Sequence, residues 1–127
     1  FEDDDGHWRS TTDGSRVFVT TAAGDLAAYA TSNGAEQWRT TVAGSDDVHL
    51  RTRPLVTERS VVVTTEKPRL DERVTTYAVD RRTGETRWTV DQPGNVGFDA
   101  VAADGRVYVP VYWSTDDGGG TLVVLSD

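Results

Sequence analysis

The sequence has no cysteine and no methionine, and isoleucine is also absent. Without cysteine there are no disulfides and no thiolate metal sites, although this does not fix the compartment. No apolar run is long enough to cross a bilayer and no signal peptide is visible, so we predict no direct insertion into a membrane. The chain begins at Phe1 rather than Met, and we expect a processed N-terminus or a piece of a longer protein.

Positive charge is scarce as well. The 127 residues include 21 Asp or Glu and 13 Lys or Arg, only one of them lysine (Lys67), for a net charge of −8. No basic stripe is present to displace phosphate counterions, which excludes nucleic acid as the expected partner and argues against anionic membrane surfaces. An Asp-rich, Lys-poor chain with abundant Thr and Val is typical of salt-adapted organisms, and we expect a halophilic archaeal source. An acidic protein of an ordinary bacterium is the alternative.

High net charge with a mean hydropathy of −0.50 raises the question of disorder. The apolar residues, however, come in short bursts within the polar background, at residues 17–19, 61–63 and 107–109. Such bursts can bury surface, so we predict a folded chain.

A glycine–tryptophan motif recurs 50 residues apart, because residues 33–38 (NGAEQW) align with residues 83–88 (TGETRW). A third copy begins at residues 120–125, which align with residues 24–29. The strand before each copy repeats too, and copies two and three share a six-residue extension of the following hairpin, around Lys67 and Ser114. Insertions confined to one loop are what a repeat on a fixed scaffold should show.

Each copy is predicted to form short antiparallel strands, because period-two alternation and Gly punctuation are strand and hairpin signals and no helical period is present. The expected strands are 7–12, 16–22, 25–31 and 35–42, then 49–57, 60–66, 73–80 and 85–91, then 97–103, 106–113 and 120–126. Four such strands repeating every 40–50 residues or so are typical of a propeller blade. We therefore predict one all-β domain over residues 1–127, a partial β-propeller with blades at about 7–42, 49–91 and 97–127. A β-sandwich is the alternative.

The spacing Gly-x-Leu-x-Ala followed by Gly-x-x-x-Trp, at Gly24, Leu26, Ala28, Gly34 and Trp38, resembles the repeat of the PQQ-like propeller family. That family includes quinoprotein alcohol dehydrogenases and the assembly lipoprotein BamB. The second copy keeps residues 77–80 (YAVD), Gly84 and Trp88, and the third keeps residues 104–109 (DGRVYV) and 120–122 (GTL). The resemblance covers nearly all of residues 13–127 and concerns packing rather than activity. The structural motif residues are Gly24, Leu26, Gly34, Trp38, Gly84, Trp88, Gly120 and Leu122.

We expect these motif residues to shape and pack the blades. Gly34 and Gly84 fall in a turn that needs positive φ. Trp38 and Trp88 are expected to pack between adjacent blades, each with its indole N–H bonded to a carbonyl. Eight residues are predicted to form the blade-face core: Val17, Val19, Leu26, Ala28, Val61, Val63, Val107 and Val109.

Chemistry-bearing residues are few. The acidic runs at residues 3–5 and 116–117 invite a calcium interpretation, but neither matches an EF-hand loop and we expect solvated charges. Residues 118–120 (GGG) are expected to be a flexible hairpin tip, and His7 and His49 have no metal spacing. A dehydrogenase of the resembled family needs an aromatic floor for PQQ, a catalytic Asp and a Ca²⁺ site; only Tyr112 and Trp113 offer stacking surface. We therefore assign no catalytic residue, no metal and no cofactor unless the dehydrogenase alternative holds.

The hypothesis is a non-catalytic protein-binding or assembly scaffold, with a fragment of a PQQ-dependent alcohol or sugar dehydrogenase as the alternative and a carbohydrate-binding propeller as a third candidate. A propeller needs about four blades or more to close. We expect a larger propeller from which this chain is a part, several chains that complete a ring, or an N-terminal segment that donates the missing strand. Family resemblance favours the cell surface or exterior over the cytoplasm.

Overall fold

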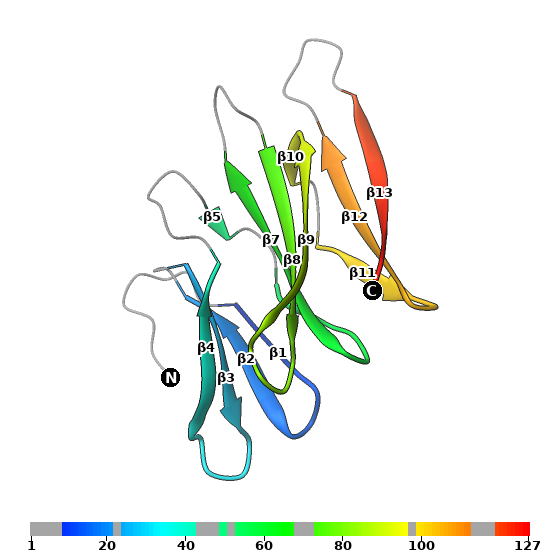
Figure 1. Ribbon diagram of the computed structural model, residues 1–127. Coiled ribbons are helices and arrows are strands. Elements are labelled where there is room, and N and C mark those ends of the chain that lie inside the picture. The colour runs from blue at the N-terminus through cyan, green and yellow to red at the C-terminus, as the bar shows by residue number, and fades with distance from the viewer. Residues whose placement is uncertain are drawn as a thin grey trace.

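The computed structural model shows three antiparallel sheets standing side by side, each with its strands in the order of a meander (Figure 1). It describes residues 9–21, 24–42, 49–50, 53–67, 73–96, 99–112 and 119–127; the side chains of residues 49, 50, 66, 67 and 96 lie outside the description. Every regular element in these ranges is a strand. The prediction of an all-β stack of propeller blades is therefore confirmed.

The first sheet, blade 1, has four strands paired in chain order: β1 (Arg9–Thr12), β2 (Arg16–Thr20), β3 (Asp25–Ala30) and β4 (Glu36–Thr41). Asp13 closes the first turn, because its Oδ1 accepts the backbone N–H groups of Ser15 at 3.0 Å and Arg16 at 2.8 Å. Aspartate is favoured in such turns because its short carboxylate reaches its own backbone two or three residues on.

Blade 2 contains β5 (His49–Leu50), β6 (Leu55–Val56), β7 (Ser60–Lys67), β8 (Arg73–Asp80) and β9 (Thr86–Pro93). The single strand predicted over 49–57 is wrong, because β5 and β6 are separate short strands that both pair with β7. Pro54 lies immediately before β6, and proline has no N–H to donate to a ladder. The β7–β8 ladder joins eight residue pairs against five for β2–β3, as the longer hairpin predicts.

Blade 3 contains β10 (Asn95–Val96), β11 (Val101–Ala103), β12 (Arg106–Tyr112) and β13 (Gly120–Ser126). The strand predicted over 97–103 is too long, because Asp99 and Ala100 are not in a strand and only β11 falls in that range; residues 97 and 98 lie outside the described residues. The short β10 was not predicted, and β10 and β11 pair with different halves of β12. The far side of β12 pairs with β13. In the described part of the chain no strand lies beyond β13, where β4 and β9 complete the other two blades.

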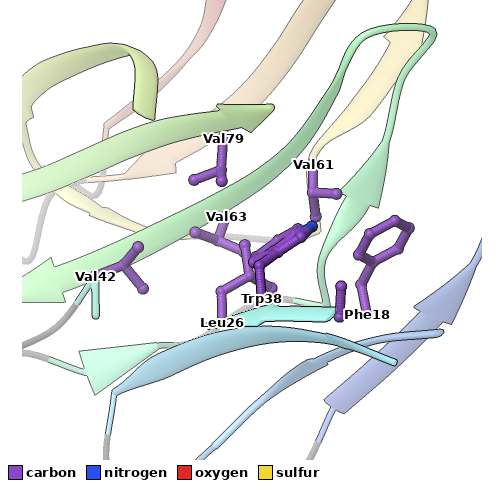
Figure 2. Close-up of a cluster of buried hydrophobic side chains, with 8 residues drawn as sticks. Phe18, Leu26, Trp38, Val42, Val61, Val63 and Val79 are labelled. Atoms are coloured by element: carbon purple, nitrogen blue, oxygen red, sulfur yellow. The ribbon is translucent and has the colours of Figure 1, made fainter. Parts of the chain in front are cut away.

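The core lies between the blades. One cluster joins blades 1 and 2 and is built from Phe18, Leu26, Ala28, Trp38, Val42, Val61, Val63 and Val79 (Figure 2). A second joins blades 2 and 3 and is built from Val62, Ala78, Ala100, Val107 and Val109. Side chains alternate across a strand, so β7 sends Val61 and Val63 to one neighbour and Val62 to the other. Each fully buried valine contributes about 1.5–3 kcal/mol.

Seven of the eight predicted core residues are buried, and Val17 is not, being only half-buried. On the first strand of each hairpin, Val17 corresponds to the fully buried Val61 and Val107. In blade 2, Val61 packs in the cluster shared with blade 1, whereas Val17 belongs to neither cluster between blades. The repeat thus predicts which way a side chain faces, but the burial depends on the neighbouring sheet.

Candidate functional site

Trp38 lies on β4, the fourth strand of blade 1, and contacts blade 2. The indole is buried on the blade face, with its ring centroid 6.0 Å from that of Phe18. Its Nε1–H donates to the carbonyl oxygen of Arg81 at 3.1 Å, and two residues on, Thr40 Oγ1 donates to the carbonyl of Gly84 at 2.6 Å. Both acceptors lie in or beside the turn between β8 and β9. Figure 2 shows the indole lying among Leu26, Val61 and Val63. The tryptophan therefore joins two blades through both its ring and its N–H.

The indole of Trp38 packs directly against Gly84. A Cβ built on Gly84 would stand 2.8 Å from Trp38 Cδ2, closer than real side chains pack, and its φ is +81°. Gly34, the same position in blade 1, has φ +71° but open space around it. The turn thus needs glycine for its backbone in both blades, and the contact with tryptophan adds a second reason in blade 2 alone.

Trp88 joins blade 2 to blade 3 as Trp38 joins blade 1 to blade 2. The acceptor of its indole N–H is a side-chain carboxylate, however, and not the carbonyl expected for both tryptophans. Its Nε1–H donates to Asp127 Oδ1 at 3.2 Å. Asp127 corresponds to Arg81, since each directly follows the last residue of its hairpin ladder, Ser126 and Asp80 respectively. Both tryptophans therefore donate to the same position of the next blade.

The Asp127 carboxylate gathers further donors from blade 2. Thr57 Oγ1 donates to Oδ2 at 2.5 Å, while Ser60 Oγ at 2.8 Å and Arg87 Nη1 at 3.1 Å donate to Oδ1. Its side chain is 7% exposed. Burial raises the pKa of Asp127, but these hydrogen bonds and the charge of Arg87 outweigh burial and leave the pKa below its ordinary value of 3.8. We call this group the Asp127 junction; it ties blade 3 to blade 2.

The remaining motif residues take no part in the contacts that Trp38 and Trp88 make between blades, and the equivalent leucines of two blades differ in burial. Gly24 has φ +89°, next to the start of β3, whereas Gly120 is not among the described glycines of positive φ. Leu26 is fully buried against blade 2, but its counterpart Leu122 is 54% exposed. The expected packing role of Leu122 therefore has no partner within the described part of the chain.

Most of the other chemistry-bearing candidates lie outside the residues that the structure describes. Residues 3–5, 7, 113 and 116–118 lie outside the described residues, and only the backbone of His49 is described. Tyr112 is 45% exposed. Among the described residues no group of three His, Asp or Glu side chains is placed to hold a metal ion.

Two features of this region were not predicted from the sequence. One is the Asp127 junction, and the other is a group of four arginines on or beside the turn before β7 and the turn between β8 and β9: Arg59, Arg81, Arg82 and Arg87. The arginines could have been found by comparing the two copies of the repeat. Aligned on their ladders, Arg59 and Arg87 of blade 2 correspond to Ser15 and Gln37 of blade 1, so the arginines are additions to the repeat.

Stacked antiparallel sheets, joined by a tryptophan on the fourth strand that reaches the next sheet, define this chain as part of a β-propeller. A family model described as "Outer membrane protein assembly factor BamB" matches residues 3–94. That is more than half of the chain, and the chain therefore belongs to this PQQ-like repeat family. No curated protein matches the chain. No described segment forms a helix of the length and apolarity that a membrane crossing requires.

Solved structures with the same fold include two dehydrogenases and one assembly factor. A europium-containing methanol dehydrogenase is 24% identical with a TM-score of 0.61, covering 67% of this chain and 15% of that one. A quinohemoprotein alcohol dehydrogenase from Pseudomonas putida is 15% identical with a TM-score of 0.70, covering 90% and 24%. BamB from Moraxella catarrhalis is 19% identical with a TM-score of 0.59, covering 93% and 36%. The chain thus spans about a third or less of each of these proteins.

Proposed function

We propose that this chain is a non-catalytic PQQ-like propeller module that binds protein and serves as an assembly scaffold. The family model that it matches carries the name of an assembly factor. The motif residues Trp38, Gly84 and Trp88 are occupied in joining blades. The repeat therefore builds a rigid stack, and the surfaces that the stack leaves open are where partners bind.

The observation that carries the proposal is the outer face of blade 3. Leu122 and Val124 are 54% and 49% exposed, and Val101 and Tyr112 are exposed on the same blade. By ladder register, Val124 corresponds to Ala28 and Ala78, the residues that pair with Trp38 and Trp88 and are fully buried. The face that is covered in blades 1 and 2 is thus apolar in blade 3, and no described residue covers it. An apolar sheet face beside an unpaired edge favours a further β-element from the same or another chain.

Val124→Asp in the full chain tests this proposal, with Thr89→Asp on exposed β9 as the matched control. If a partner protein covers the face, Val124→Asp releases that protein, because a buried unpaired charge is strongly unfavourable. A loss of stability without release of a protein indicates instead that a β-element of the same chain covers the face. Thr89→Asp changes neither. Hydrogen exchange of β13 and pull-down from native lysate measure the two effects. Fast exchange of β13 with no protein captured would defeat the proposal.

The alternative is a segment of a PQQ-dependent alcohol or sugar dehydrogenase, and two of the similar structures are titled as alcohol or methanol dehydrogenases. PQQ and Ca²⁺ enter only under this alternative. Reduction of a redox dye by alcohols or sugars, after PQQ and Ca²⁺ are added to the full chain, would support it against the scaffold.

We further propose a location at the cell surface or exterior and a salt-adapted source. The family name refers to the outer membrane, and the net charge of −8 fits a high-salt solvent. Fractionation of cells that produce the protein checks the location, since recovery with the cytoplasmic fraction alone would contradict it.

A further inference from the structure

The two turns of blade 2 bring four arginines to one hollow. The turn before β7 carries Arg59, and the turn between β8 and β9 carries Arg81 and Arg82, with Arg87 following at the start of β9. They line a hollow of about 460 Å³ together with Glu58 and Asp80. Four arginines and two acidic residues thus line one hollow in a chain whose net charge is −8.

Backbone contacts fix this arrangement of the turns. Thr57 Oγ1 accepts the N–H of Ser60 at 2.9 Å and closes the first turn, and the N–H of Arg81 donates to the carbonyl of Arg59 at 3.2 Å, which ties the two turns together. Asp80 Oδ1 accepts the N–H groups of Arg82 at 2.8 Å and Thr83 at 3.1 Å. The Asp80 carboxylate is therefore engaged by its own turn, and these bonds hold its pKa below the ordinary value.

Two of the four arginines are engaged within the molecule. Arg87 Nη1 donates to Asp127, and Arg81 lies 3.7 Å from an Asp13 carboxylate oxygen of blade 1. Arg59 and Arg82 are exposed, and neither guanidinium pairs with a carboxylate within the described part of the chain. Among the described residues, Arg59 and Arg82 are therefore the two arginines of the hollow that make no ion pair, and Glu58 and Asp80 lie beside them.

The turns themselves do not require arginine at these four positions. Aligned on the ladders, Arg59, Arg81, Arg82 and Arg87 correspond in blade 1 to Ser15, Thr31, Ser32 and Gln37. Blade 1 forms the corresponding turns with neutral side chains at these four positions. Clustered like charges disfavour the folded state by a small amount, and a residue that the packing does not need is a candidate for binding.

We propose that this arginine hollow binds an acidic segment of a protein partner through carboxylate–guanidinium pairs. This inference rests on the proposed protein-binding function and specifies a partner for it. Guanidinium groups present paired N–H donors that match carboxylate oxygens. The hollow is open to solvent along one side, so an extended peptide can lie across it with more than one side chain against the arginines.

A second, smaller hollow shares Glu58 and Arg59 with the first. It measures about 310 Å³ and reaches the turn before β12, where Arg106 and Asp104 lie. The bound segment thus has room to extend from blade 2 toward blade 3. Glu58, exposed and common to both hollows, opposes the binding of acidic side chains and offers a variant that strengthens it.

The test uses a rhodamine-labelled hexapeptide of alternating Asp and Glu, its Asn/Gln analogue, and inorganic phosphate as a competitor. Fluorescence anisotropy is recorded on the full chain at about 0.15 M salt, where distant charges are screened beyond about 8 Å. We expect saturable binding of the acidic peptide only. Arg59→Ala/Arg82→Ala should weaken it at least tenfold, and Glu58→Gln should tighten it by about threefold.

The matched control is Arg9→Ala/Arg53→Ala, which removes the same charge from exposed positions outside the hollow. It should change affinity less than twofold. Equal losses in the two double variants would overturn the proposal, as would absence of peptide binding by the unaltered chain or binding of phosphate alone. The Val124→Asp variant should keep peptide affinity, so failure here and failure of the scaffold proposal are distinguished.

Discussion

Replacing Gly84 with alanine tests whether the blade seam depends on a glycine in one blade and a tryptophan in the previous one. The φ of +81° at Gly84 disfavours any side chain by about 1–2 kcal/mol. The new Cβ would also stand 2.8 Å from Trp38 Cδ2 and Cε3. The indole must then move, and overpacking of this kind costs about 1–3 kcal/mol.

Movement of the indole also weakens two hydrogen bonds across the seam. They are Trp38 Nε1–H to the Arg81 carbonyl and Thr40 Oγ1–H to the Gly84 carbonyl, each worth about 1 kcal/mol. We therefore expect Gly84→Ala to lower the free energy of unfolding by about 3–5 kcal/mol, allowing for partial relaxation. For a chain of this size, that corresponds to a fall in Tm of roughly 10 °C or more.

Gly34→Ala is the matched control, because Gly34 has φ +71° in the same turn of blade 1 but nothing near a new Cβ. It should lose only the backbone contribution, about 1–2 kcal/mol. The measurement is urea unfolding of the full chain followed by circular dichroism. If the two substitutions destabilise equally, within about 0.5 kcal/mol, then the contact between Gly84 and Trp38 does not stabilise the seam.

Three further predictions concern polar groups and charge. Thr64→Val should raise the free energy of unfolding by about 1 kcal/mol, because the buried Thr64 Oγ1 has no hydrogen-bond partner among the described residues; a loss of stability in urea unfolding would contradict this. Asp127 has a lowered pKa in the folded chain, so its stabilisation is present above the unfolded value of about 3.8 and lost as pH falls through the folded value. Asp127→Asn should therefore lower stability at pH 7 by about 1–3 kcal/mol and flatten the acid limb of stability against pH, and an unchanged acid limb would refute the junction. Raising NaCl from about 0.1 M to about 2 M should raise Tm by screening the net charge of −8, and a fall would show that ion pairs outweigh repulsion.

Much of the fold was predictable because the repeat encodes it locally. Gly34 and Gly84, spaced four residues before Trp38 and Trp88, place the last turn and the last strand of two blades. The broken first strands of blades 2 and 3 were not predictable from alternation. In blade 2, Pro54 precedes β6, but Thr and Val on either side continue the strand pattern. The position of the break is set by pairing, because β5 and β6 bond to different halves of β7.

The candidate site was less predictable, because it depends on contacts between residues far apart in the chain. Asp127 meets Thr57 and Ser60, residues that are 70 and 67 positions away. No spacing rule links such residues. Only the stacking of blade 3 on blade 2 brings them together, so the junction emerges from tertiary structure rather than from a motif.

Internal repeats nevertheless allow one kind of functional reasoning within a single sequence. Two copies of a blade perform the same structural task, so what they share is needed for folding, as with Trp38 and Trp88. What they do not share is free to serve something else. Arg59 and Arg82 differ from Ser15 and Ser32 in this way, and both arginines are exposed beside a hollow. If binding at that hollow fails while blade 2 keeps its stability without the two arginines, the difference between the copies reflects surface charge alone.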